Sequence, residues 1–208
     1  MIGKPTPYRI TAEGNVYVAL DHYTQQEDKM ITDSLIEHVK KYEGFSTEPY
    51  KDTKGKWTVG YGRNLEDNPL TLDETIDLFQ MTDFISDKHE DDFFEGMLEK
   101  DISEHTEELL QQIPWLANKP TNVKMVICDM AYNLGVPTLM TFTGMLNAAR
   151  HDDWLLTAYE ILDSNYAEDV KTRAVANAKI VAGGQYQEAV DLLSQRNTAR
   201  YNAIEQYL

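Results

Sequence analysis

The stretch EGFSTEPYKDTKGKWTVGYG, residues 43–62, carries the strongest structural signals in the chain. It opens on Glu43-Gly44, and a glycine in that setting is typical of a helix end. Three further glycines then punctuate aromatic and β-branched residues, a pattern typical of short strands joined by tight turns. We therefore predict that a helix ends near Gly44 and that a small twisted sheet follows over residues 45–65.

Two acids flank this junction: Glu43 at the helix end and Asp52 at the entry to a hairpin. A helix end that meets a sheet forms one wall of a cleft, so both carboxylates are expected to face one groove. Glycoside hydrolysis uses such a pair, because one carboxyl donates a proton while the other, ionised, activates water or stabilises positive charge. The neighbours Tyr42 and Phe45 predict partial desolvation of Glu43, and the lysines around Asp52 favour its ionised form.

Helical patterns surround the predicted sheet. Upstream, Leu35, Ile36, Val39 and Tyr42 recur at helical spacing, which predicts a helix from residue 32 or 33 to Gly44. Downstream, a Thr-x-x-Glu capping box at residues 71–74 predicts a helix to about residue 85. The remaining helices are expected at residues 92–113, 122–133, 141–149, 153–162, 167–181 and 185–208. The predicted fold class is α+β, with a small antiparallel sheet lobe beside a mainly helical lobe.

The composition excludes several classes of function. The chain has 208 residues, 42% of them apolar, which is enough for a substantial core. Its net charge of −16 argues against a nucleic-acid partner, because the anionic phosphate backbone would be repelled. No apolar run is long enough for membrane insertion, the histidines lack zinc-ligand spacing, and we predict no metal and no cofactor. The single cysteine, Cys128, rules out an internal disulfide and is expected to be a small buried side chain on a helix.

The signature segment resembles the catalytic region of the phage-type lysozymes, glycoside hydrolase family 24. The resemblance rests on the spacing Glu-x8-Asp-x5-Thr in Glu43, Asp52 and Thr58, within a Gly-x-x-Thr-x-Gly-x-Gly frame. A second segment, DMAYNLG at residues 129–135, resembles the central helix of the family and the turn after it. The resemblance covers about residues 34–192 and is poor over residues 68–91.

The resemblance implies a role for each matching residue. Glu43 is implied to be the general acid, Asp52 the base that activates water, and Thr58 a residue that helps to hold this water. Arg173 is implied to form an ion pair with Glu43 or to steady the cleft. The sugar groove is implied to be lined by five residues: Gly62, Asn64, Tyr132, Asn133 and Phe142. If a water fits between the two carboxyls, inversion at the anomeric carbon follows.

The chain also departs from the family pattern. Arg63 stands where the family often has histidine, and we expect it to pair with Asp101. Tyr166 stands where the family has tryptophan. Taken singly, Arg173 also fits a solvated helix face and Tyr132 a core position, so these two roles have a purely structural alternative.

We divide the chain into an N-terminal extension at residues 1–30, with a possible hairpin over residues 8–18, and a lysozyme domain at residues 31–208. Residues 193–208 form a C-terminal helical extension of that domain. The first 21 residues lack the apolar segment of a signal peptide. We therefore expect the protein to stay in the host cytoplasm until its release to the periplasm or cell wall, through a holin or another route. We also expect it to be a monomer.

Three functions remain open from the sequence. The first is an endolysin-type muramidase that cuts the β-1,4 bond between N-acetylmuramic acid and N-acetylglucosamine in bacterial peptidoglycan. The second is a virion-associated or effector lysozyme docked through residues 1–30, which a pull-down from virions would separate from the first. The third is a non-catalytic glycan-binding module. The acidic charge fits poorly with an anionic wall, so we expect a local basic groove built from Lys51, Lys54, Lys56 and Arg63.

Overall fold

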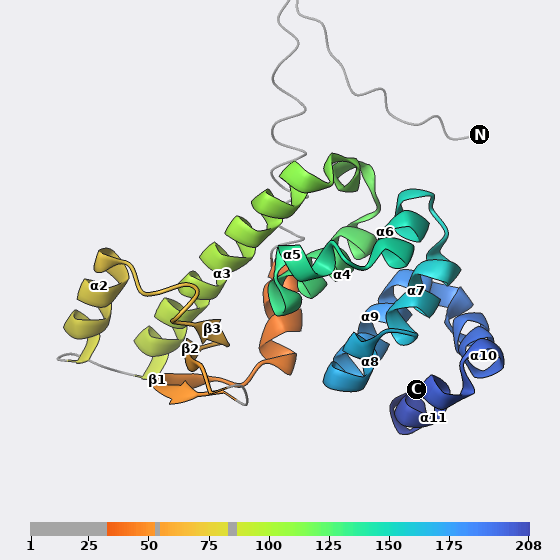
Figure 1. Ribbon diagram of the computed structural model, residues 1–208. Helices are drawn as coiled ribbons and strands as arrows, with labels where there is room; N and C mark the ends of the chain where they lie inside the picture. The colour runs from red at the N-terminus through yellow and green to blue at the C-terminus, as the bar shows by residue number, and fades with distance from the viewer. Residues whose placement is uncertain (1–32, 53–54, 83–86) are drawn as a thin grey trace, which may run out of the picture.

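The computed structural model describes residues 33–52, 55–82 and 87–208. The hairpin predicted within residues 1–30 lies outside these residues. The chain has an α+β fold, as predicted: a small antiparallel sheet at one end of the molecule and a mainly helical lobe at the other (Figure 1).

The sheet follows the predicted turn chemistry. A helix at residues 33–42 ends where the Glu43 N–H donates to the Val39 carbonyl (2.9 Å). Three strands follow in the order β1-β2-β3, and both pairs are antiparallel. Gly60 and Gly62 have φ values of +60° and +86°, a region that other residues rarely adopt, so the turn between β2 and β3 requires glycine at both positions. The strands are β1 (Ser46–Lys51), β2 (Trp57–Gly60) and β3 (Arg63–Asn64).

Helices make up most of the remaining chain. The longest, α3, runs from the sheet lobe to the helical lobe and so joins them (Figure 1). The predicted capping box of α2 is confirmed, since Thr71 N–H donates to Glu74 Oε2 (2.8 Å) and Glu74 N–H to Thr71 Oγ1 (3.2 Å). The helices are α2 (Leu72–Thr82), α3 (Asp87–Gln112), η1 (Pro114–Asn118), α4 (Thr121–Leu134), α5 (Val136–Leu139), α6 (Thr143–Arg150), α7 (Trp154–Leu162), α8 (Asn165–Val170), α9 (Thr172–Ala182), η2 (Gly183–Gln185), α10 (Tyr186–Arg196), α11 (Thr198–Ile204) and η3 (Glu205–Tyr207).

Two predicted helices are each broken in the structure. The helix expected at residues 167–181 is divided into α8 and α9 at Lys171. Lys171 has a φ of +44°, which is incompatible with a continuous α-helix. The helix expected at residues 185–208 is broken at Asn197, whose side chain accepts from the Arg200 N–H (3.1 Å) and donates to Asp163 (2.6 Å). A short polar side chain that caps the next helix and also makes a tertiary bond competes with helix continuation.

One large core runs through the helical lobe, and a smaller one lies under the sheet. The large core extends from Leu35 near the start of the described chain to Ile204 in α11, so the C-terminal helices belong to it. Cys128 lies in this core, buried on α4 as expected. The small core consists of Val59, Phe94 and Met97. Within the residues described, no helix combines the length and apolar character needed to cross a membrane.

Candidate active site

A cleft of about 580 Å³ lies between the sheet, α3 and the C-terminal end of α4. The structure brings seven of the predicted site residues into its lining: Glu43, Asp52, Thr58, Gly62, Asn64, Tyr132 and Asn133. The fold brings together residues that are far apart in the chain. Asn133 Nδ2, for example, lies 3.4 Å from Glu43 Oε1, although the two residues are 90 positions apart. In the part of the chain that the structure describes, no group of three or more histidine, cysteine or acidic side chains is placed to hold a metal ion.

The carboxylate of Glu43 is held on several sides. Arg173 Nη1 donates to Glu43 Oε1 at 2.5 Å, and Asn133 makes the weaker bond to the same oxygen. Gly62 lies against the other oxygen, because a Cβ at that position would be 2.9 Å from Glu43 Oε2. The side chain remains 21% exposed, so Glu43 is partly desolvated, as its neighbours in sequence predict, and still reaches the cleft.

Asp52 is positioned by the hairpin turn that follows β1. Its Oδ1 accepts from the Lys56 N–H (2.8 Å), and its own N–H donates to the Lys56 carbonyl (2.9 Å). Thr58 pairs with Tyr50 across the sheet and is 3% exposed, with its hydroxyl 3.3 Å from the Lys56 carbonyl. Tyr50 lines the same cleft, where burial, and then the charges of Glu43 and Asp52, raise the pKa of its phenol.

Arg173 is buried behind Glu43 and also binds a second carboxylate. Its Nε lies 3.2 Å from both oxygens of Asp129, and its Nη2 donates to Asp129 Oδ1 at 2.7 Å. Burial opposes the charge of Arg173, but the hydrogen bonds and charge of Asp129, together with the charge of Glu43, outweigh it and raise the pKa of the guanidinium. Asp129 was not among the site residues predicted from the sequence. The available signal was an acid within a continuous run of apolar residues, since Ile127, Cys128, Met130 and Ala131 are all core residues.

Arg63 lies under the sheet end of the cleft, 5% exposed, and is paired with two acids. Its Nη2 donates to Asp101 Oδ1 (2.7 Å), which confirms the expected pair, and its Nη1 lies 2.9 Å from Glu74 Oε2. Asn68 adds a bond to Asp101 at 2.9 Å. Arg63 therefore supports the cleft wall with its charge balanced.

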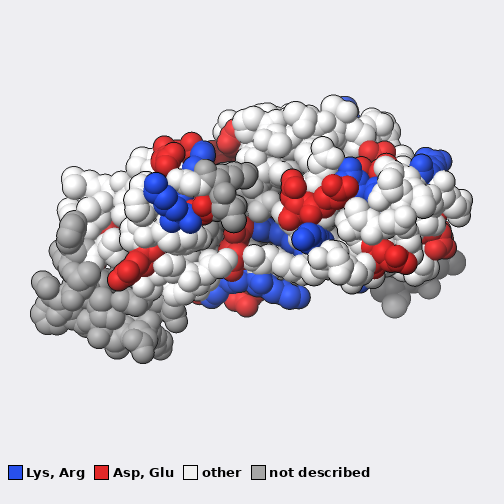
Figure 2. Space-filling view, turned by 60° about the horizontal axis from the view of Figure 1, so that its bottom comes forward, with Lys and Arg blue, Asp and Glu red and all other residues white. Residues whose placement is uncertain are grey.

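Of the four cations expected to form a basic groove, the two that line the cleft, Lys56 and Arg63, are paired with acids. Arg63 is neutralised by its two acids, and Lys56 Nζ lies 2.5 Å from Asp67. Lys51 lies over the ring of Trp57, and Lys54 lies outside the described residues. Figure 2 shows acidic and basic side chains interspersed on the face in view. The abundance of acids explains this pairing, because Lys56 and Arg63 each have a carboxylate within reach.

Two of the predicted sugar-binding residues use their polar atoms within the protein. The Tyr132 hydroxyl donates to the Tyr61 carbonyl (2.9 Å), and burial raises the pKa of this phenol. Asn64 Nδ2 donates to Asp67 (2.6 Å), and its Oδ1 accepts from the Glu66 N–H (2.9 Å). Both side chains therefore shape the cleft wall.

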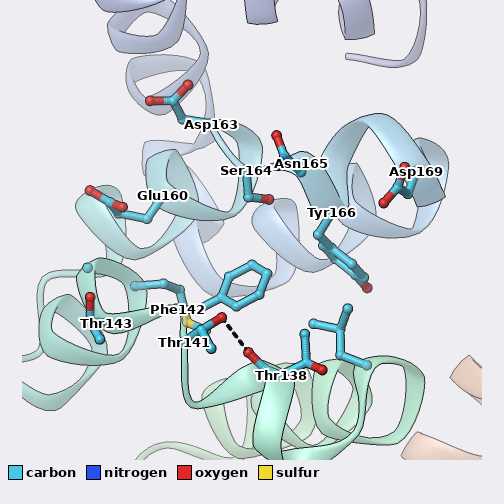
Figure 3. Close-up of a pocket in the computed structure, with 13 residues that line it drawn as sticks. Thr138, Thr141, Phe142, Thr143, Glu160, Asp163, Ser164, Asn165, Tyr166 and Asp169 are labelled. Carbon is cyan, nitrogen blue, oxygen red and sulfur yellow. Dashed lines mark hydrogen bonds between the residues drawn. The ribbon is translucent and has the colours of Figure 1, made fainter.

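Phe142 lies in a second hollow, of about 510 Å³, between α5, α6, α7 and α8. In Figure 3 its ring points into this space beside Tyr166, with the ring centroids 6.4 Å apart. The acids Glu160, Asp163 and Asp169 line the rim. Leu134 lines both hollows, so they are neighbours, but the structure does not bring Phe142 to the cleft that holds Glu43 and Asp52.

Comparison with known proteins agrees with this geometry. Residues 40–180 match the family described as phage lysozyme, a range that contains both acids of the cleft and Arg173. The chain is also 30% identical over 166 residues to a protein from Dictyostelium discoideum named probable T4-type lysozyme 1, covering 73% of this chain and 95% of that relative. The chain thus belongs to the phage lysozyme family and is a glycoside hydrolase of the lysozyme type.

Proposed function

We propose that this protein is an endolysin-type muramidase that hydrolyses the β-1,4 bond between N-acetylmuramic acid and N-acetylglucosamine in bacterial peptidoglycan. The observation that carries the proposal is the shared cleft: Glu43 from a helix end and Asp52 from the hairpin turn line the same cavity of about 580 Å³. The family match supports the substrate class.

The surroundings of the two acids support different roles for them. The side chain of Glu43 faces the cleft and is only 21% exposed to solvent. It is proposed to protonate the leaving glycosidic oxygen. Asp52, fixed by backbone bonds within its turn, is proposed to accept a proton from the attacking water. Thr58, buried next to the same turn, is proposed to help orient that water.

The test is release of reducing ends from purified peptidoglycan by the wild-type protein and by Glu43→Gln and Asp52→Asn. Each variant is isosteric and removes one titratable group, so we expect each to lose at least about 100-fold in rate, the usual size of a general acid–base contribution. Clearing of outer-membrane-permeabilised Gram-negative cells should fall in parallel. A wild-type protein that releases no reducing ends would refute the function, and full activity of Glu43→Gln would refute the assignment of the acid.

For the biological setting, we propose that the protein remains in the host cytoplasm and gains access to the wall through a holin. Expression in Gram-negative cells with and without a holin tests it: lysis is expected only with the holin. Lysis at the same rate without one would contradict the proposal.

A further inference from the structure

Glu43, the proposed general acid, is paired with the buried cation Arg173. A general acid must hold a proton at working pH, yet Arg173 donates directly to Glu43, and an adjacent positive charge favours the ionised carboxylate. We propose that Asp129 is a positioning residue that balances the charge of Arg173, so that Arg173 orients Glu43 while leaving it able to carry the catalytic proton. This inference rests on the proposed function, since it concerns the proton that Glu43 donates.

The hydrogen bonds of the guanidinium are divided unequally between the two acids. The carboxylate of Asp129 accepts hydrogen bonds from both Nε and Nη2 of Arg173, and the shorter of these bonds measures 2.7 Å. The carboxylate of Glu43 accepts only from Nη1. A side-on pair of this kind is the strongest geometry between arginine and a carboxylate. One guanidinium thus faces two carboxylates, and the favourable pairing belongs to Asp129.

The two carboxyls differ in burial and in the number of hydrogen-bond donors around them. Asp129 is fully buried, but each of its oxygens accepts from Arg173, and Asn177 Nδ2 adds a bond to Oδ2 at 2.7 Å. Several donors around one carboxylate stabilise its ionised form. Glu43 has one strong donor and the 3.4 Å contact from Asn133. With Arg173 balanced by Asp129, the proton is expected on Glu43.

The network continues to a neutral histidine. Because the Asn177 amide nitrogen donates to Asp129, its oxygen is the acceptor for His38 Nε2, which lies 3.0 Å away. Burial, opposed by the charge of Asp129, lowers the pKa of His38 below its ordinary value. At neutral pH the ring therefore adds no second positive charge that would favour ionised Glu43.

Other titratable groups also surround Glu43. Asp52 acts together with Glu43 on Tyr50, and Asp101 acts together with Glu43 on Tyr132. Tyr50, Tyr132 and Tyr166 all have a raised pKa, chiefly through burial, and so stay neutral at working pH. Asp129 is therefore the group whose charge acts on Glu43 through Arg173.

The test is Asp129→Asn, assayed by the pH profile of reducing-end release. With its partner charge removed, Arg173 should favour ionised Glu43, and the alkaline limb of the profile is expected to move down by about one pH unit. Glu74→Gln is the matched control, because it also removes a carboxylate paired with a buried arginine, but in the sheet lobe. It is expected to lower stability and leave the limb in place. An unmoved limb in folded Asp129→Asn would overturn the inference.

A second measurement requires neither activity nor a stable variant. Carbon-13 NMR of labelled wild-type carboxyl groups follows Glu43 and Asp129 directly as the pH is lowered. Asp129 should keep the chemical shift of an ionised carboxylate at pH values where Glu43 is already protonated, and the reverse order would overturn the inference. If the wild type cleaves no peptidoglycan but the carboxyls titrate in the expected order, the proposed function fails while the coupling stands.

Discussion

Gly62 shows how a single residue shapes the cleft. Its φ is +86°, and a Cβ built there would lie 2.9 Å from Glu43 Oε2. The glycine therefore serves both the turn between β2 and β3 and the close approach of the backbone to the proposed acid. The conformation of the turn and the position of the proposed general acid therefore both depend on the absence of a side chain at residue 62.

We predict that Gly62→Ala loses activity beyond what its loss of stability explains. The positive φ should cost about 1–2 kcal/mol, and the new methyl group should displace Glu43 from Arg173, lowering kcat by at least about tenfold. Urea denaturation and reducing-end release measure the two effects. Gly55→Ala is the matched control, since Gly55 has a φ of +80° but no atom within 4 Å of the added Cβ. It should lose similar stability and retain kcat; equal losses of kcat in the two variants would contradict the steric explanation.

Residues differ in how far the sequence predicts their place. Glu43, Asp52 and Thr58 were predicted from a helix end that meets a hairpin and from a spacing that resembles the phage-type lysozymes, and they do line one cleft. Asp129 was not, because its importance arises from the crossing of α4 and α9, which brings Arg173 to it across 44 positions of sequence. Long-range pairing of this kind leaves only a weak signal in the local sequence: an acid within a run of apolar residues.

At the scale of elements, the start of α2 joins the small sheet lobe through Glu74. This residue closes the capping box with Thr71 and also binds Arg63 and Lys100. Burial opposes its charge, but these bonds outweigh burial and lower the pKa of Glu74 from its ordinary 4.5 to about 2. One side chain therefore supports both a helix end and the cation beneath the cleft.

We predict that Glu74 contributes acid-dependent stability. Its folded pKa lies below its unfolded value, so the contribution is complete above pH 4.5 and is lost as the pH falls toward 2. The shift corresponds to about 3 kcal/mol at neutral pH. Glu74→Gln should remove most of this stability and flatten the pH dependence between about 5 and 2, as measured by urea denaturation. Asp73→Asn is the control, because Asp73 is an exposed acid in the same turn; it should change neither the stability nor its pH dependence. A pH dependence of stability in Glu74→Gln equal to that of the wild type would refute the prediction.

Element boundaries show where local patterns are insufficient. The capping box of α2 and the glycines of the hairpin are local devices, and the structure confirms both. The breaks at Lys171 and Asn197 were missed. Asn197 is tied to Asp163 in α7, and α9 begins so that Arg173 lies on its buried side. At Asn197 a tertiary contact overrides helix propensity.

At the scale of the whole molecule, the charge remains the strongest constraint on the proposed substrate. The net charge is −16, and the cations near the cleft are largely paired, so a long-range repulsion from an anionic wall is expected.

We predict that activity on whole peptidoglycan rises from low to moderate salt. The Debye length shrinks from about 30 Å at 0.01 M to about 10 Å at 0.1 M, which screens repulsion between the protein surface and the wall. Turbidity clearing over this range measures the effect, with the melting temperature recorded at each salt concentration as the control for stability. Flat activity with unchanged stability would contradict it.

The buried thiol of α4 has a practical consequence for handling the protein. Burial raises the pKa of Cys128 to about 11, so almost none of this sulfur is present as the thiolate that attacks a disulfide. The chain has no other cysteine with which to cross-link internally. The folded molecule therefore keeps the same covalent structure in a reducing and in an oxidising compartment, and it needs no reducing agent during purification or assay.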